Sequence, residues 1–183
     1  MARVPEFDQK SMTEEQRKVV HEIVSGPHAR IVGPYHAWLH SPELARRARN
    51  LSEYIRFKSS VPKRLAELGI LITGRYWQAE FEYWAHAKLA KEAGVDEAVI
   101  SAIAKKQRPA FKHTDEELVY TLCMEMYETR RISEKTYQQA LKALGLQAIV
   151  DLVATIGYYS MVSMTLNAFE MPLPAGEKSP FAE

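Results

Sequence analysis

Apolar residues recur every three or four positions along almost the whole chain, and this periodicity limits the folds that the sequence can adopt. Such spacing places apolar side chains on one face of a helix. No segment alternates apolar and polar residues between hairpin turns, as an antiparallel sheet would require. The sequence therefore predicts an all-α fold, built as a bundle of several helices.

Residues typical of helix ends separate the predicted helices. One helix is predicted at about 12–25, where Ser and Thr caps and acidic residues precede the apolar positions. Another begins with Ser41 as N-cap and Pro42 in its first turn. Gly94 is a candidate C-cap, and Gly74 either separates two helices or lies within one. The remaining helices are predicted within 61–77, 78–94, 96–106, 114–131, 133–144 and 147–169.

The length of 183 residues suits one domain with a full core. We expect a single domain over 1–183, with a core at about 60–145, a helical extension over 1–58 and an irregular, Pro-rich arm over 170–183 that lies on a neighbouring subunit.

The net charge of +1 is spread along the chain, which argues against a nucleic-acid partner. No apolar run approaches the ~18 residues of a membrane span, and the N-terminus shows no apolar signal core. The expected location is cytoplasmic, with no membrane partner.

Glu82 and His86 stand four positions apart in AEFEYWAHAKLAKEAGV, residues 79–95. At about 100° per residue they share one helix face with alanines and Leu89, away from the charged stripe that carries Lys88 and Lys91. A buried carboxylate needs a partner, and a histidine one turn away supplies one. The pair is a functional acid–base site, a buried structural pair or an exposed ion pair; periodicity alone leaves all three open.

Trp77, Phe81 and Trp84 form a second apolar stripe on the same helical wheel. A helix with two apolar faces must bury both, and tryptophan is favoured at interfaces between subunits. We therefore expect a homo-oligomer, although packing under the chain's own loops explains the stripe nearly as well. The lone Cys123 falls on the apolar side of its predicted helix, where packing is the expected role.

The segment RLAELGILITGRYWQAEFEYWAHAKLAKEAGVDEAVISAI, residues 64–103, resembles the core of the carboxymuconolactone decarboxylase and alkylhydroperoxidase-D-like superfamily. The features that carry the resemblance are Glu67 in ELGIL and the Glu82-x-x-x-His86 motif. GPYHAWLHSPELA and GYYSMVSMTLNAFEMPLP, on either side, are similar to longer members that lack cysteines. The resemblance implies an all-helical bundle of the alkylhydroperoxidase-D-like type, assembled as trimers or hexamers.

The two branches of this superfamily differ at the same motif. The peroxidase branch carries Cys-x-x-Cys followed by histidine, and those cysteine positions correspond here to Ala79 and Glu82. The dithiol peroxidase mechanism is therefore excluded. The decarboxylase branch keeps Glu-x-x-x-His, as this chain does, which implies a lyase or isomerase of aromatic compound catabolism. The longer N-terminus and the additional aromatic residues leave the lactone substrate open.

The resemblance and the residue chemistry together define a candidate site. His86 is the expected proton donor, Glu82 orients or reprotonates it, and Glu67 is a second relay group. Arg75 is a candidate anchor for a substrate carboxylate, or a counter-ion for the glutamates. Tyr158 or Tyr159 could supply a hydroxyl, although an aromatic core position is the more common role of such residues.

The expected reaction needs no cofactor, and its substrate is a small organic acid or lactone. Glu67, Glu82 and His86 could also bind a metal, and His36 and His40 form another pair at helical spacing, but no metal is expected. Two other function classes remain. One is a peroxide-handling protein that depends on Cys123. The other is a binding or assembly protein whose Glu82–His86 pair is closed off by packing.

Overall fold

The computed structural model describes residues 2–5, 10–26 and 30–181. Within these residues it contains nine α-helices and no β-strand, which confirms the all-α prediction. In chain order the helices are α1 (Glu14–Val24), α2 (Tyr35–Trp38), α3 (Pro42–Phe57), α4 (Lys63–Tyr76), α5 (Glu80–Glu92), α6 (Glu97–Ala104), α7 (Thr114–Thr129), α8 (Glu134–Leu144) and α9 (Leu146–Ala168).

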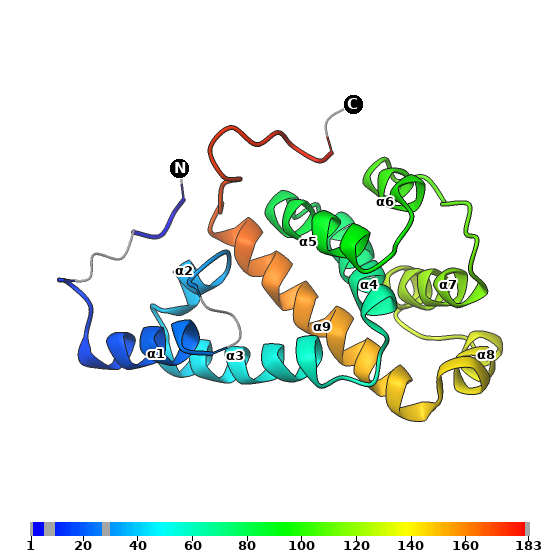
Figure 1. Cartoon of the computed structure of the whole chain (residues 1–183), viewed down its shortest axis with the longest axis horizontal. Coiled ribbons are helices and arrows are strands. Elements are labelled where there is room, and N and C mark those ends of the chain that lie inside the picture. The colour runs from blue at the N-terminus through cyan, green and yellow to red at the C-terminus, as the bar shows by residue number, and fades with distance from the viewer. Residues whose placement is uncertain (1, 6–9, 27–29, 182–183) are drawn as a thin grey trace.

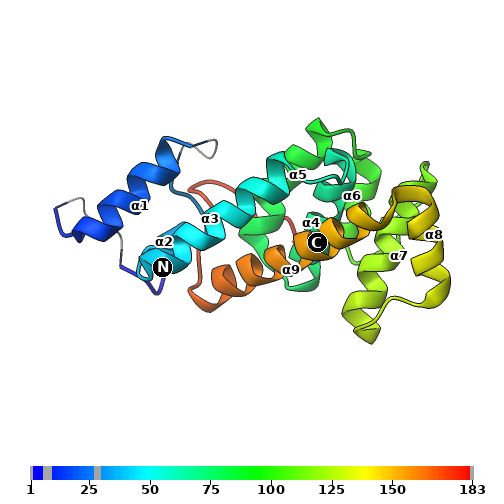
Figure 2. The ribbon, with the colours of Figure 1, turned by 90° about the horizontal axis from the view of Figure 1, so that it is seen from below.

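Helix α9 crosses the middle of the molecule and packs along α4 (Figure 1). The N-terminal helices α1 to α3 lie at one end of the molecule and α7 and α8 at the other, as the perpendicular view also shows (Figure 2). Two apolar clusters follow this division. One surrounds α4 and includes Leu152 and Ile156 of α9, and the other joins α1 to α3 to Val162 and Leu166 of α9. Helix α9 therefore links the N-terminal extension to the rest of the bundle.

Helix α9 is also long and apolar enough to cross a membrane, judged by length and composition alone. However, 56% of its most apolar window is buried against the other helices. Its buried polar residues include Asp151, whose carboxylate accepts hydrogen bonds from Tyr54 and Ser60. This burial is the pattern of a core helix.

Several predicted helix ends are found where the sequence placed them. Thr13 forms a capping box with Gln16 at the start of α1, and Asp96 caps α6 by accepting from the backbone of Ala98. Ser41 precedes Pro42 as the N-cap of α3, but its side chain makes no capping bond. Gly94 follows the C-cap of α5 in a left-handed conformation, with φ of +98°.

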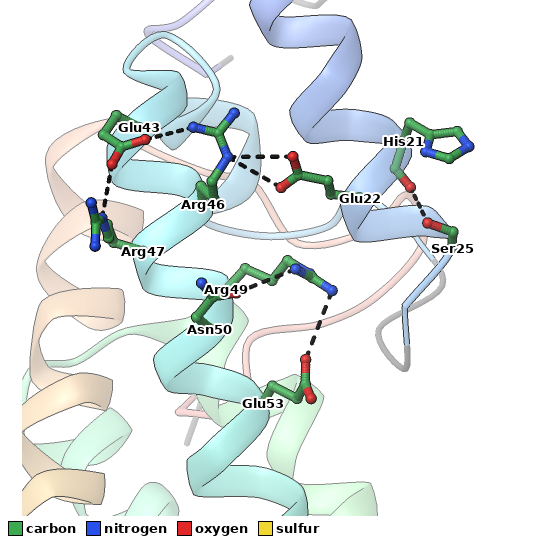
Figure 3. Close-up of polar contacts among 9 residues, drawn as sticks. All are labelled: His21, Glu22, Ser25, Glu43, Arg46, Arg47, Arg49, Asn50 and Glu53. Atoms are coloured by element: carbon green, nitrogen blue, oxygen red, sulfur yellow. Dashed lines mark hydrogen bonds and ion pairs between the residues drawn. The ribbon is translucent and has the colours of Figure 1, made fainter.

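Ion pairs attach α1 to α3 (Figure 3). Arg46 of α3 contacts Glu22 of α1 at 3.2 Å and Glu43 of its own helix at 2.5 Å. Within α3, Arg49 pairs with Glu53 at 3.7 Å. Because Arg46 is only partly exposed, its pair with Glu22 is better protected from solvent than an ordinary surface pair.

The C-terminal arm is irregular over residues 170–181, as predicted, and its last two residues lie outside the described part of the chain. The arm packs on α5 of its own chain. The Ser179 hydroxyl donates to Glu80 at 2.5 Å, and the Phe181 ring lies edge-on to Tyr83 with centroids 5.1 Å apart. The expected contact with a neighbouring subunit stays a prediction, as do the boundaries of the core and the extension.

Candidate functional site

The turn between α4 and α5 brings the two helices of the site together. Gly74 lies within α4, and a Cβ at this position would approach the backbone nitrogen of Tyr83 to 3.4 Å. The chain then turns sharply through Gln78, whose φ is +54°, and enters α5 at Glu80. Helix α5 therefore returns along α4, so that Glu67 of α4 faces the carboxylate and imidazole of α5.

The three predicted catalytic residues form one buried row. Nδ1 of His86 donates a hydrogen bond of 2.6 Å to Oε2 of Glu67, and Nε2 lies 3.1 Å from Oε1 of Glu82. Their exposed fractions are 4% for Glu67, 3% for Glu82 and 5% for His86. The second contact lacks hydrogen-bond geometry, since Oε1 of Glu82 has no hydrogen-bond partner among the described residues. The Nε2 proton is therefore not directed at Glu82.

The two carboxylates determine the charge of the imidazole. Burial alone would lower the pKa of His86, but the charge of Glu82 and the hydrogen bond to Glu67 outweigh it and raise that pKa to about 9. At neutral pH His86 is consequently an imidazolium between two carboxylates. An acidic proton on Nε2 beside a carboxylate is the arrangement that general acid catalysis requires.

A cavity of about 1580 Å³ opens next to this row, between the N-terminal helices, α5, α9 and the C-terminal arm. Glu82 and His86 both line it, together with Tyr158 and Tyr159. The Tyr159 ring lies edge-on to the His86 ring, with centroids 5.0 Å apart. Burial raises the pKa of both tyrosines, so their hydroxyls remain protonated. Four of the predicted site residues therefore meet at one cavity.

Arg75 lies elsewhere. Its Nε donates a 2.7 Å hydrogen bond to the carbonyl of Ala104, and its guanidinium lies over the Phe181 ring at 4.3 Å. It does not line the cavity, and the structure does not bring it to the glutamates. Two other arginines line the cavity, Arg30 and Arg56, and the sequence reasoning missed both; the charge of Arg56 of α3 acts on Tyr159.

The three residues of the predicted aromatic stripe do not lie on one helix. Trp77 is the C-cap of α4 and precedes α5, so it does not share a helical wheel with Phe81 and Trp84. Phe81 and Trp84 line the cavity instead of forming a separate outer face. The stripe therefore gives no argument for a subunit interface.

Neither Cys123 nor the pair His36 and His40 forms a hydrogen bond or ion pair with the Glu67–His86–Glu82 row. Cys123 is fully buried, and burial raises the pKa of its thiol to about 12, which disfavours the reactive thiolate. His36 of α2 lines the cavity but is exposed, and His40 is exposed just after α2. No group of three or more candidate ligands in the described residues could hold a metal ion, and both ring nitrogens of His86 already face carboxylates.

Comparison with known proteins identifies the fold. No family model matches the sequence, and no curated protein matches it. The chain superposes on the alkylhydroperoxidase AhpD core of an uncharacterized peroxidase-related protein from Ralstonia eutropha JMP134, with a TM-score of 0.75 and 13% identity over 98% of this chain and 94% of the other. An uncharacterized peroxidase-related protein from Silicibacter sp. TM1040 gives a TM-score of 0.72 at 13% identity, over 94% and 90% of the two chains. The chain therefore has the all-helical fold of the alkylhydroperoxidase AhpD core.

Proposed function

We propose that the protein is a cofactor-free lyase or isomerase that carries out acid–base chemistry on a small organic acid or lactone. The observation that carries this proposal is the row Glu67–His86–Glu82, with a protonated imidazole at the wall of a cavity. Buried acid–base groups with shifted pKa values in a cavity are typical of active sites.

The chemistry would divide among the three residues. In a decarboxylation, the electrons of the breaking carbon–carboxylate bond flow into a conjugated carbonyl and leave carbon dioxide and a dienolate. The dienolate carbon then takes the proton from Nε2 of His86. In an isomerisation, the carboxylate of Glu82 takes a proton from one carbon of the substrate, and Nε2 of His86 gives a proton to another carbon. Glu67 holds the ring through Nδ1, and solvent in the cavity carries a proton from Glu82 to the neutral imidazole.

Two observations favour this proposal over the other function classes. A binding protein without chemistry was expected to close the pair off by packing, whereas Glu82 and His86 line a cavity. A peroxide-handling protein would depend on Cys123, whose burial and raised pKa give no support to thiol chemistry. We propose further that the chain forms a homo-oligomer, a trimer or a hexamer, in the cytoplasm.

The test uses unsaturated lactone acids, with turnover followed by their ultraviolet absorbance. His86→Asn and Glu82→Gln, both close in size to the native side chains, should each lower turnover at least about 10²-fold. His113→Gln is the matched control, because this exposed histidine lies at the start of α7 and makes no capping bond. Circular dichroism confirms that the variants fold. Wild-type turnover in both site variants would contradict the proposal.

A further inference from the structure

The cavity has a second polar wall, which faces the α5 wall and belongs to the N-terminal extension. Ser52 and Arg56 lie one turn apart on α3, and both line the same cavity as Glu82 and His86. Residues at this spacing share a helix face, so both side chains approach the cavity from the same side. Ser52 is buried and Arg56 is half-buried. This wall of the cavity is therefore partly shielded from bulk solvent.

Arg56 differs from the other arginines of its helix. Arg46, Arg47 and Arg49 each pair with a glutamate (Figure 3). Arg56 forms no ion pair with any carboxylate in the described part of the chain; its guanidinium carbon lies 5.6 Å from the centroid of the neighbouring Phe57 ring. A partly buried guanidinium carries five donors and matches a carboxylate through its planar fork. The guanidinium N–H groups of Arg56 can therefore bind an anion that enters the cavity.

Three hydroxyls gather beside this arginine. Tyr35 of α2, Ser52 of α3 and Tyr158 of α9 all line the same cavity, and the charge of Arg56 acts on the Tyr35 hydroxyl. Burial raises the pKa of both tyrosines, so these hydroxyls remain O–H donors at neutral pH. The end of the cavity at α3 therefore combines a cation with neutral donors, which is a suitable environment for a carboxylate.

Tyr159 connects the two ends of the cavity. The charge of Arg56 and the charges of Glu82 and Glu67 all act on its hydroxyl, with opposite effects on its pKa. The His86 ring lies against the Tyr159 ring. An anionic ligand would be attracted to the arginine end and repelled from the glutamate end, and this difference would orient it.

We propose that Arg56, together with the hydroxyls of Ser52 and Tyr35, is the anion-binding end of the cavity and selects a small aromatic or unsaturated carboxylate. The apolar body of the ligand lies against Phe81 and Trp84, so that its far end meets His86. The proposal rests on the function proposed for the site, and it names the substrate group and the residue that binds it. The N-terminal extension is then the substrate-binding half of the site.

Binding of benzoate, measured without turnover, tests the proposal. Trp84 lines the cavity, so its fluorescence reports binding at this place, and Trp84→Phe identifies its share of the signal. Benzoate should bind at least about 10-fold more tightly than benzamide, its neutral analogue, since an ionic hydrogen bond is replaced by a neutral one. Arg56→Gln should weaken benzoate binding by at least about 10-fold and leave benzamide binding unchanged.

Arg47→Gln is the matched control, because this arginine of the same helix is exposed and pairs with Glu43 outside the cavity. It should bind benzoate as the wild type does. Equal affinity for benzoate and benzamide, undiminished benzoate binding in Arg56→Gln, or no benzoate binding by the wild type would each overturn the proposal. Turnover is measured separately with His86→Asn. Loss of benzoate binding in Arg56→Gln, together with full turnover in His86→Asn, would support the anion site and reject the proposed reaction.

Discussion

Replacing Glu82 with glutamine should change how the stability of the protein depends on pH. In the folded protein the pKa of His86 is about 9, above the ordinary histidine value of about 6.5. The folded state therefore holds a proton that the unfolded state releases between these two values. The stabilisation is fully present below the unfolded pKa and is lost as the pH rises through the folded pKa.

The size of the effect follows from the shift. The difference between the folded and unfolded pKa values of His86 corresponds to about 3 kcal/mol of unfolding free energy at low pH. Of this, about 2 kcal/mol should be lost between about pH 6.5 and about pH 8.5. In Glu82→Gln the imidazole keeps Glu67 but loses the charge of Glu82, which acts on it most strongly in the wild type. Burial then lowers its pKa toward the unfolded value, and the loss should shrink.

Urea unfolding at a series of pH values, followed by far-ultraviolet circular dichroism, measures both proteins. The comparison ends at about pH 8.5 because Cys123, whose buried thiol has a pKa of about 12, adds its own loss once the unfolded thiol ionises. Other titrating groups cancel in the difference between wild type and variant. The wild type should lose about 2 kcal/mol over this window, and the variant clearly less. Parallel curves for the two proteins would refute the reasoning.

Three further predictions concern the frame that holds the site, each measured by urea unfolding at neutral pH. Gly157→Ala, whose new Cβ meets nothing within 4 Å, should stabilise the protein by about 0.5–1 kcal/mol. Gly69→Ala should be less stable than Gly157→Ala by at least about 1 kcal/mol, because its new Cβ would lie 3.3 Å from Leu152. Equal stabilities of the two variants would contradict the proposed packing. Thr13→Ala removes the capping box of α1 and should lower the free energy of unfolding by about 1 kcal/mol. An unchanged urea midpoint would show that the cap is not formed. Asp151→Asn weakens the hydrogen bonds that this carboxylate accepts from Ser60 and should cost about 1–3 kcal/mol, and wild-type stability would contradict that role.

The acid–base pair could be predicted because its geometry is local. Glu82 and His86 share one helix, so a spacing of four residues places them together without any knowledge of the tertiary fold. Glu67 was assigned through the family resemblance, and the close passage of α5 along α4 at Gly74 explains how it reaches His86. The predicted cluster depends on one turn and two helices.

Arg75 shows the limit of the helical wheel. Arg75 would share a helix face with Glu82 and His86 only if one helix continued past Gly74 into the motif. Helix α4 ends at Tyr76, and the turn through Gln78 reverses the chain before α5 begins. Angles counted across that turn have no meaning, and Arg75 bonds to Ala104 instead. No local pattern marks such a turn, since Gln78 adopts its positive φ without a glycine.

The other side of the cavity could not be predicted from local patterns at all. Tyr35, Ser52 and Arg56 reach the site because α9 packs against both α3 and α4. The only signal available in the sequence was that Ser52 and Arg56 stand at helical spacing within a segment rich in paired arginines and glutamates. That Arg56 pairs with no glutamate of the described residues becomes visible only once the helices are placed.

Titration of the His86 ring by long-range proton–nitrogen NMR tests the central claim most directly, since that claim requires an imidazolium at the cavity wall. Nitrogen-15 labelling of histidine, with His86→Asn to assign the signal, gives its pKa in the folded protein. The account predicts a midpoint of about 9, with both ring nitrogens protonated at neutral pH. A midpoint at or below the ordinary histidine value of about 6.5 would contradict it, because a neutral imidazole could not be the proton donor.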